Sequence, residues 1–228
     1  MSSGLQPLAR RIFQGLSPSY DRVLEYVTLL QDRYWKRWLL QAASIREGEA
    51  VLDLGCGTGV LEESVAGRGG VVGLDLTEDM LRLAQAKRLP SVASLCLGDA
   101  ERLPFSDGAF DVVLSCYVVK YCRAPLLASE ASRVLRPGGR LVLYDFSRPR
   151  GALAPFLALY VYGFLRLMGV AMRLVGSSGA FTYQALPSVI RERRWDDTLA
   201  GVLSSAGFRK IGARRLSGGA ATGFSAVK

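Results

Sequence analysis

The stretch AVLDLGCGTG, residues 50–59, decides the fold. Its apolar residues predict a buried β-strand, and the strand runs directly into glycines at positions 55, 57 and 59. Glycine lets the backbone turn tightly and pass close to a ligand. The backbone amides at the start of the following helix can then face that ligand. We therefore expect a ligand-binding loop at the end of this strand.

Two acidic residues accompany the loop. Asp53 lies in the strand itself and is predicted either to contact the ligand or to hold the glycine-rich loop in place. Asp75 lies near the end of the next apolar run, VVGLDL, 20 residues after Gly55. A carboxylate at that place can accept hydrogen bonds from two ribose hydroxyls. The spacing GxGxG differs from the GxGxxG typical of nicotinamide dinucleotide folds.

Strands and helices alternate outward from this loop. Further strands are expected at Ser94–Leu97, Phe110–Cys116 and Arg140–Phe146, with helices near Val60–Ala66, Met80–Lys87 and Leu126–Leu135. Thr77 is the expected N-cap of the second helix, and the turn Pro137-Gly138-Gly139 is expected to stop the third before the fifth strand. This alternation predicts an α/β fold with a doubly wound, mostly parallel sheet.

The end of the chain predicts two more strands. A helix is expected at Asp196–Ala206, followed by the strand-like runs Phe208–Leu216 and Ala221–Val227 on either side of Gly218-Gly219. Two such runs around a glycine turn favour an antiparallel hairpin. The sheet is therefore expected to have seven strands and to close on this hairpin.

Composition excludes several classes of protein. The 228 residues are half apolar, which excludes a disordered chain. No histidine is present, so a His-based triad, a His-ligated metal and an imidazole base are excluded. The cysteines, at positions 56, 96, 116 and 122, lack the spacing of a zinc site, and the N-terminus shows no signal-peptide pattern. We expect free thiols, no metal and a cytoplasmic location.

The net charge of +9 is concentrated near the end of the chain. Residues 46–145 carry 11 basic and 14 acidic groups, whereas residues 146–228 carry 12 and 3. This basic part includes Gly151–Gly176, an apolar segment whose only charges are Arg166 and Arg173. Its uncharged stretch is shorter than the ~20 residues of a membrane-spanning helix. We expect an apolar cap over the substrate, the alternative being ordinary core, with basic residues that contact an anionic membrane surface.

Three further motifs follow the loop in order: GDAERLPF (98–105), FDVVLSCYVV (110–119) and RVLRPGGRLVL (133–143). With them the sequence resembles class I S-adenosylmethionine (SAM)-dependent methyltransferases, and more narrowly the ubiquinone/menaquinone biosynthesis C-methyltransferase (UbiE/MenG-type) family. The resemblance includes YDRVLEYVTLLQDRYWKRWL (20–39) and LYDFSRP (143–149), and so covers nearly the whole chain. It implies a Rossmann-like fold with SAM as methyl donor, S-adenosylhomocysteine as product and no metal.

Carried over residue by residue, the resemblance implies the SAM contacts. They are Tyr20, Gly55, Gly57, Thr58, Asp75, Leu76, Asp99, Ala100 and Cys116, and Asp53 is a tenth candidate. Cys116 stands where the family usually has serine, so its contact is expected through the backbone or a weak thiol bond. Lys120-Tyr121 replaces the family's Arg-Asn pair, and the N-terminal segment lacks the family's Asn and His. These departures are on the methyl-acceptor side and leave the acceptor open.

Methylation of a phenol ring at carbon requires the hydroxyl to lose its proton, so that negative charge reaches the ortho carbon. Without histidine, the base is a carboxylate, a lysine, a tyrosine, or a water held by one of them. Lys120 is the first candidate by its place in the family pattern, because a cation there lowers the pKa of a bound phenol. Tyr121 and Asp145 are further candidates, and Tyr117 and Tyr183 are reserves for acceptor contacts.

The expected function is C-methylation of a lipophilic prenylated quinol or phenol. The alternative is O- or N-methylation of another lipid or small molecule. An RNA methyltransferase is less favoured, because SCYVVKY after the fourth strand contains no Asn/Asp-Pro-Pro-Tyr motif and the basic tail lacks interleaved aromatics. No nucleic-acid partner is therefore expected.

The chain is expected to form one methyltransferase domain over residues 1–228. Within it, residues 1–45 form an N-terminal helical segment and residues 46–149 the cofactor-binding core. Residues 150–190 form the helical cap, and residues 191–228 the closing helix and hairpin.

Overall fold

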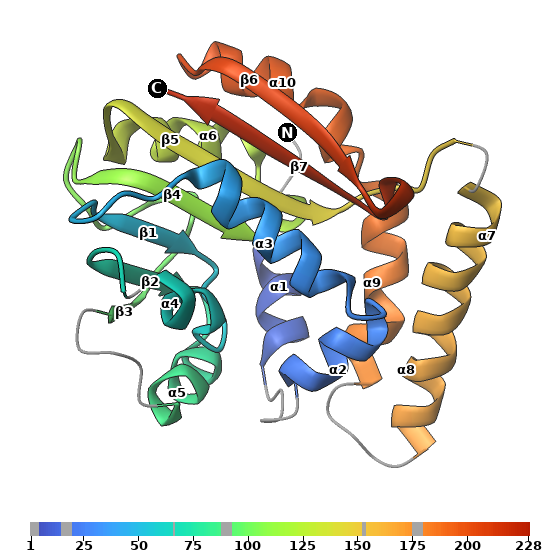
Figure 1. Cartoon of the computed structure of the whole chain (residues 1–228). Coiled ribbons are helices and arrows are strands. Elements are labelled where there is room, and N and C mark those ends of the chain that lie inside the picture. Colours follow the sequence, from blue (N-terminus) through green and yellow to red (C-terminus); the bar gives the residue numbers. More distant parts are fainter. Residues whose placement is uncertain (1–4, 15–19, 66, 88–92, 152–153, 175–179) are drawn as a thin grey trace.

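The computed structural model describes residues 5–14, 20–65, 67–87, 93–151, 154–174 and 180–228. Within these ranges seven strands form one sheet in the order β3-β2-β1-β4-β5-β7-β6 (Figure 1). The strands are β1 (Val51–Leu54), β2 (Val71–Asp75), β3 (Ala93–Leu97), β4 (Phe110–Cys116), β5 (Leu135–Phe146), β6 (Arg209–Leu216) and β7 (Ala221–Val227). β1 to β5 are parallel, and β7 is antiparallel to both β5 and β6. The predicted mostly parallel sheet with an antiparallel C-terminal hairpin is confirmed.

Helices connect these strands and cover the sheet (Figure 1). In the described residues they are α1 (Gln6–Phe13), α2 (Tyr20–Val27), α3 (Gln31–Ala43), α4 (Val60–Val65), α5 (Glu78–Ala86), α6 (Ala124–Val134), α7 (Ala154–Ala158), α8 (Phe164–Leu174), α9 (Ala180–Glu192) and α10 (Trp195–Ser205). Short turns of 3₁₀ or π-helix are η1 (Val119–Tyr121), η2 (Leu159–Gly163) and η3 (Ser217–Gly219).

One predicted boundary is wrong. The turn at Pro137–Gly139 does not separate α6 from the fifth strand, because α6 ends earlier and Leu135 already pairs with Phe110 of β4. Leu135 is fully buried, so its side chain anchors the backbone in the core before the turn. The turn therefore lies within β5, where Gly138 adopts a φ of +81°.

The sheet buries apolar side chains on both faces, because successive residues of a strand point to opposite sides. Val112 of β4 packs in one core with Trp35 of α3. The adjacent Val113 packs in the other core with Leu127 of α6 and Leu199 of α10. Burying each large apolar side chain contributes roughly 1.5–3 kcal/mol. This two-sided burial fixes the positions of the strand ends.

The strand order reverses between β1 and β4, which lie side by side although two strands separate them in sequence. In doubly wound sheets, ligands bind at the carboxyl ends of the strands beside such a switch point. Here those ends carry the glycine-rich loop after β1, and Cys116 with the segment Tyr117–Tyr121 that follows β4. The fold therefore brings two predicted site segments together.

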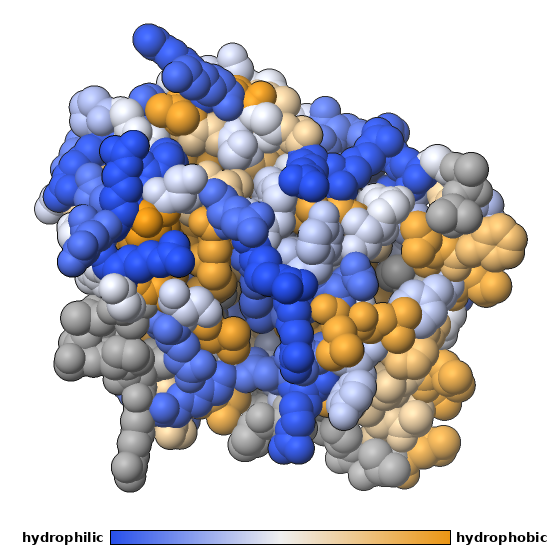
Figure 2. Space-filling model, in the orientation of Figure 1, coloured by the Kyte–Doolittle hydropathy of each residue, from blue (hydrophilic) through white to orange (hydrophobic). Residues whose placement is uncertain are grey.

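The predicted cap is built from α7, η2, α8 and α9. Leu165 of α8 and Leu186 and Ile190 of α9 join the core that covers the α3 face of the sheet. The outer side of α7, η2 and α8 remains exposed and apolar: Phe156, Leu159, Leu167, Val170 and Leu174 are 52–82% exposed. Figure 2 shows hydrophobic atoms gathered along this edge of the molecule. In the described part of the chain, no helix combines the length and apolarity needed to cross a bilayer.

Candidate active site

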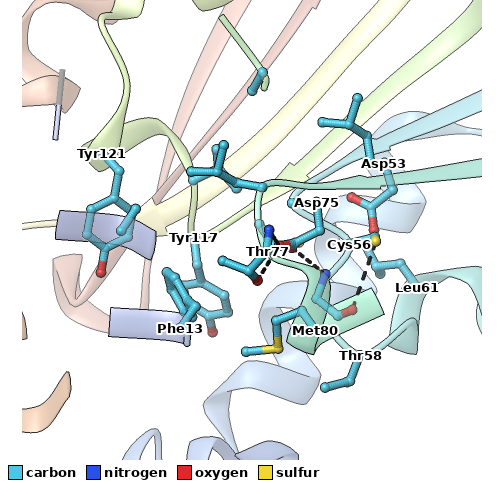
Figure 3. A pocket seen from close by; sticks show the side chains of 18 of the residues that line it. Phe13, Asp53, Cys56, Thr58, Leu61, Asp75, Thr77, Met80, Tyr117 and Tyr121 are labelled. Carbon is cyan, nitrogen blue, oxygen red and sulfur yellow. Dashed lines mark hydrogen bonds between the residues drawn. The ribbon is translucent and has the colours of Figure 1, made fainter. Parts of the chain in front are cut away.

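A cavity of about 980 Å³, partly open to solvent, lies at the carboxyl ends of β1, β2 and β4. All ten predicted SAM contacts line it: Tyr20, Asp53, Gly55, Gly57, Thr58, Asp75, Leu76, Asp99, Ala100 and Cys116. Figure 3 shows aromatic side chains on one side of this cavity and the glycine-rich loop with Asp53 on the other.

The glycine-rich loop takes a conformation that favours glycine. Gly55, Gly57 and Gly59 all have positive φ, between +55° and +79°. A Cβ on Gly55 would overlap Cγ2 of Val118, whereas a Cβ on Gly57 would meet no atom within 4 Å. The backbone of Gly55 therefore packs against the segment after β4, and that of Gly57 faces open space in the cavity wall.

Asp75 holds this loop against the end of β2. Its Oδ2 accepts a hydrogen bond from the backbone N–H of Gly57 at 3.0 Å. Its Oδ1 accepts bonds from the N–H and the hydroxyl of Thr77, both at 2.8 Å (Figure 3). Thr77 occupies the N-cap position of α5, but its hydroxyl binds Asp75 and does not cap the helix, which corrects the expectation. Burial raises the pKa of Asp75, and the bonds from Thr77 and Gly57 oppose that rise.

Asp53 and Glu62 form a buried acidic pair behind the loop. Asp53 is 1% exposed, and its Oδ1 has no hydrogen-bond partner among the described residues. Glu62 of α4 is fully buried, and neither carboxyl oxygen has such a partner. Burial and the nearby charges of Glu62 and Asp75 raise the pKa of Asp53. An unpaired acceptor in the cavity wall suits a ligand that carries positive charge or donates hydrogen bonds.

Glu62 makes the stability of the protein depend on pH. Burial raises its pKa from 4.5 to about 7 in the folded state. The folded protein thus binds more protons than the unfolded chain between these values, so stability falls as the pH rises from about 4.5 through 7, by about 3 kcal/mol. We expect Glu62→Gln to flatten this fall and to be the more stable form at pH 8, as measured by urea unfolding across the range. Glu63→Gln, on the exposed neighbour, is the control, and equal pH dependence in wild type and Glu62→Gln would contradict the prediction.

Asp99 contacts the N-terminal segment at the other end of the cavity. Its Oδ1 accepts hydrogen bonds from Nε2 of Gln6 at 2.9 Å and from the N–H of Glu101 at 2.8 Å. Ala100, Leu76 and Met80 provide apolar surface beside it. Gln6 was not predicted as a site residue, because nothing in the sequence indicates that the start of α1 meets Asp99, which follows β3.

A second contact joins α2 to the glycine-rich loop. The Thr58 hydroxyl donates to Oδ1 of Asp21 at 2.7 Å, and Nζ of Lys87 donates to Asp21 Oδ2 at 2.6 Å and to Thr58 Oγ1 at 2.9 Å. These bonds place Tyr20, the neighbour of Asp21, in the cavity wall. Asp21 and Lys87 were also not predicted, since 66 residues separate them in sequence.

A smaller, mainly aromatic compartment adjoins the large cavity. It is lined by Ile12, Phe13, Tyr20, Leu24, Val27, Tyr117, Lys120, Tyr121, Phe146 and Leu186, and half of these residues also line the large cavity. Among its described lining residues, Lys120 is the one that carries a charge. We name it the aromatic compartment.

Lys120 is buried and ion-paired. Its Nζ donates to Asp145 Oδ1 at 2.7 Å and to the backbone carbonyl of Tyr117 at 2.6 Å, and it lies 4.3 Å from the centre of the Tyr121 ring. Burial lowers the pKa of Lys120, while the Asp145 carboxylate raises it. Asp145 is fully buried and lines neither cavity. The side chain of Tyr183 lies outside the described part of the chain.

Cys116 ends β4 in the wall of the large cavity, and Tyr117, the next residue, lines both cavities. Burial raises the pKa of the Cys116 thiol, which keeps it uncharged. All four cysteines are free. Tyr117 has a φ of +65°, a left-handed conformation that costs a bulky residue roughly 1–2 kcal/mol.

A buried network behind Tyr117 was not predicted from the sequence. Asp32 Oδ1 accepts hydrogen bonds from the hydroxyls of Tyr117 at 2.6 Å and Tyr144 at 3.0 Å. Its Oδ2 accepts from Nζ of Lys36 at 2.6 Å, and Lys36 lines the large cavity. The one sequence signal that could have indicated this network is the i,i+4 spacing of Asp32 and Lys36.

Among the described residues, no three or more Cys, Asp or Glu side chains are arranged to hold a metal ion.

Comparison with known proteins identifies the family. The sequence matches the model of the ubiE/COQ5 methyltransferase family over residues 5–228. Demethylmenaquinone methyltransferases from Beutenbergia cavernae and Tropheryma whipplei are 39% and 36% identical to it. These alignments cover 91% and 92% of this chain, and 85% and 87% of the relatives.

Solved structures show the same fold. A SAM-dependent methyltransferase from Aquifex aeolicus has a TM-score of 0.61 at 20% identity, over 93% of this chain and 98% of that one. A phosphoethanolamine N-methyltransferase from Haemonchus contortus, solved with S-adenosylhomocysteine, has a TM-score of 0.58 at 18% identity, over 93% of this chain and 60% of that one. The fold, the cavity at the switch point and the family match agree: the chain belongs to the ubiE/COQ5 methyltransferase family and is a SAM-dependent methyltransferase.

Proposed function

We propose that this enzyme transfers a methyl group from SAM to a ring carbon of a prenylated quinol. The observation that carries the proposal is the aromatic compartment beside the large cavity, because it offers an apolar place for a ring and a lipophilic tail. The relatives named above are demethylmenaquinone methyltransferases, which supports a quinol of that class. An RNA substrate needs a wide basic cleft, whereas Lys36 is the one basic side chain among the described residues that line the large cavity.

The large cavity fits SAM through its polar groups. The unpaired, buried Oδ1 of Asp53 is available to the positively charged methionine part, and the Gly57 backbone faces open space. Asp75 and Asp99 both line this cavity, which supports the assignment of Asp75 to the ribose hydroxyls and of Asp99 to the adenine amino group. When bound, SAM supplies a methyl group already activated on a positively charged sulfur, so the protein mainly aligns the reactants and excludes water.

The remaining predicted contacts act through the backbone or through packing. Thr58 ties the loop to α2, so Tyr20 closes the cavity next to the glycine-rich loop. Leu76 and Ala100 provide apolar surface for the adenine, and Cys116 lines the large cavity next to Tyr117, which lines both cavities. Tyr121 lines both cavities and offers ring surface to the acceptor.

A methylation assay tests the proposed reaction. The protein is incubated with methyl-labelled SAM and, separately, with demethylmenaquinols of increasing prenyl length, phospholipids and total RNA. We expect label on the quinol ring carbon, located by NMR, and a KM that falls as the prenyl chain lengthens. Label on a quinol oxygen or on a phospholipid nitrogen would establish the O- or N-methyltransferase alternative. Label on RNA alone would exclude the quinol.

We further propose that the outer face of α7, η2 and α8 rests on an anionic membrane surface. Exposed Leu167 and Leu174 are seven residues apart on α8, so they share a face, and Arg166 and Arg173 are exposed beside them. Apolar side chains flanked by basic ones are typical of helices that lie in a membrane interface. A lipophilic acceptor is itself dissolved in such a membrane. The enzyme would then act from the cytoplasmic side, as one domain.

Changing the apolar face should release the enzyme from lipid. We expect the double variant Leu167→Ser, Leu174→Ser to bind anionic vesicles at least tenfold more weakly at low salt, because each leucine contributes about 1.5–3 kcal/mol when buried in the interface. Co-sedimentation with vesicles measures this. Leu126→Ser, a partly exposed leucine on α6, is the control. Wild-type protein that fails to bind anionic vesicles at low salt would contradict the proposal.

A further inference from the structure

Tyr117 is held in its left-handed conformation from three directions. Its backbone N–H donates to the carbonyl of Tyr144 at 3.0 Å, and its own carbonyl accepts from Lys120 Nζ at 2.6 Å. Its hydroxyl donates to Asp32 Oδ1 at 2.6 Å. A bulky residue keeps such a conformation only when its surroundings impose it, and such residues cluster at functional sites. The strained backbone thus indicates that the Tyr117 side chain must occupy a particular position.

That position is the boundary between the large cavity, proposed for SAM, and the aromatic compartment, proposed for the methyl acceptor. Tyr117 lines both the large cavity and the aromatic compartment, and it directly follows Cys116 at the end of β4. Figure 3 shows its ring on the aromatic side of the cavity, across from the glycine-rich loop. An acceptor ring in the aromatic compartment therefore lies next to the Tyr117 side chain.

Asp32 is a buried carboxylate reached through Tyr117. It is 2% exposed, lines neither cavity, and accepts from Tyr117 and Tyr144 at Oδ1 and from Lys36 at Oδ2. Its backbone N–H donates to Thr28 Oγ1, which fixes it at the start of α3. The chain Tyr117–Asp32 therefore connects the cavity wall to a proton acceptor that water does not reach directly.

Lys120 is less suited to take the acceptor proton. Its ammonium is already bonded to Asp145 and to the Tyr117 carbonyl. Among the described residues that line the aromatic compartment, no charged side chain other than Lys120 could act as the base. These bonds make Lys120 a positioning residue for the turn that presents Tyr117.

We propose that Tyr117 and Asp32 form a proton relay that removes the hydroxyl proton of the methyl acceptor. This inference rests on the proposed function, a phenolic acceptor methylated at carbon. The acceptor hydroxyl donates to the Tyr117 oxygen, and as its proton moves there, the Tyr117 proton moves to Asp32 Oδ1. Burial and the Asp32 charge raise the pKa of Tyr117, so the phenol stays protonated and is able to pass a proton on.

The relay balances the reaction. The acceptor oxygen keeps the O–H electron pair, whose charge spreads to the ortho carbon. That carbon forms the new C–C bond with the methyl group, and the broken C–S bond leaves its electron pair on sulfur. The carbon then loses its own proton to water, and Asp32 returns its proton through Tyr117 to the acceptor oxygen. One proton is released for each methyl group transferred.

Tyr117→Phe tests the relay while keeping the ring. We expect turnover at neutral pH to fall by about 100-fold or more, the usual contribution of a general base, while the SAM dissociation constant from calorimetry changes less than about threefold. Under anaerobic conditions, the variant rate should recover about tenfold per pH unit, because the quinol then ionises in solution. The wild-type rate should stay nearly flat. Asp32→Asn should follow Tyr117→Phe in both respects.

Two further tyrosine variants distinguish proton transfer through Tyr117 from a role in which its hydroxyl only holds Asp32 in position. Tyr144→Phe removes the other phenol bonded to the same Asp32 oxygen, from a residue that lines neither cavity. The turnover of Tyr144→Phe should fall only a few-fold at neutral pH, and it should not recover as the pH rises. Tyr34→Phe, on α3 outside both cavities, should match wild type. Equal losses in Tyr117→Phe and Tyr144→Phe without pH recovery, or full activity of Tyr117→Phe, would overturn the relay.

A direct binding readout does not depend on turnover. A naphthol whose ring carbon is already methylated is titrated into the protein, and its ionisation is followed by naphtholate absorbance. We expect the bound naphthol to ionise at lower pH in wild type than in Tyr117→Phe. If the naphthol binds with the same pKa in both proteins, the relay is overturned while the proposed function stands. If no naphthol binds and wild type labels no quinol, the proposed function itself fails.

Discussion

Asp75→Ala is expected to raise the dissociation constant for SAM by at least about 100-fold. The carboxylate fixes the glycine-rich loop through Gly57, and in the proposed binding mode it also accepts the ribose hydroxyls. Hydrogen bonds to a charged group contribute about 1.5–3 kcal/mol each, so losing two of them removes roughly 3–6 kcal/mol of binding free energy. Isothermal titration calorimetry with SAM measures the change.

The control for Asp75 lies on the same short segment. Glu78→Ala removes an exposed carboxylate that pairs with Arg82 at the surface, and it should leave the affinity for SAM unchanged. Asp75→Asn preserves the packing but places an amide N–H against donors of Thr77 or Gly57, so it should also bind SAM poorly. Wild-type affinity in Asp75→Ala would overturn the assignment of the cavity to SAM.

Gly55→Ala is expected to destabilise the protein by about 2–5 kcal/mol. The new methyl group would overlap Cγ2 of Val118, and alanine at a φ of +75° is strained whatever the space. Overpacking costs roughly 1–3 kcal/mol, and the left-handed backbone adds about 1–2 kcal/mol. Because Val118 follows Tyr117, the overlap also pushes the glycine-rich loop and the segment after β4 apart. Urea unfolding measures the loss.

Two other glycines separate backbone strain from effects on the ligand. Gly57→Ala has room for its methyl group, so it should cost only about 1–2 kcal/mol of stability, yet it should weaken SAM binding because the methyl group occupies open space in the cavity wall. Gly48→Ala has a φ of +81° and equal room, but it lies outside the cavity. It should match Gly57→Ala in stability and wild type in SAM affinity. Equal SAM affinity for both variants would show that Gly57 does not face the ligand.

The strand pattern and the residues that line the large cavity were predictable because their signals are local. Buried parallel strands appear as continuous apolar runs, and the bounds of β4 and β7 match the expected runs. Parallel strands also place their carboxyl ends at one edge, which explains why residues as distant as Gly55 and Asp99 line one cavity.

The details that depend on packing were not predictable from local patterns. Leu135 enters β5 before the turn because the core holds it, although proline and two glycines follow closely. The Thr77 hydroxyl binds Asp75, because that carboxylate lies at the adjacent strand end. Gln6 reaches Asp99 across 93 residues, a contact that depends on how α1 packs against η1 and α9.

The sequence by itself determined the α/β sheet, the glycine-rich loop and the ten candidate contacts to the donor, since apolar periodicity and residue spacing act over short stretches. The contacts around Tyr117 were decided only by the tertiary structure. Lys120 is the candidate base by its place in the sequence, and the structure shows its ammonium buried and bonded to Asp145 and to the Tyr117 carbonyl. Asp32 lies 85 residues from Tyr117, and only the packing of α3 on the sheet brings its carboxylate to the tyrosine hydroxyl. Contacts between residues so distant in sequence form only when the chain folds, because the packing of buried apolar side chains determines which elements lie next to each other.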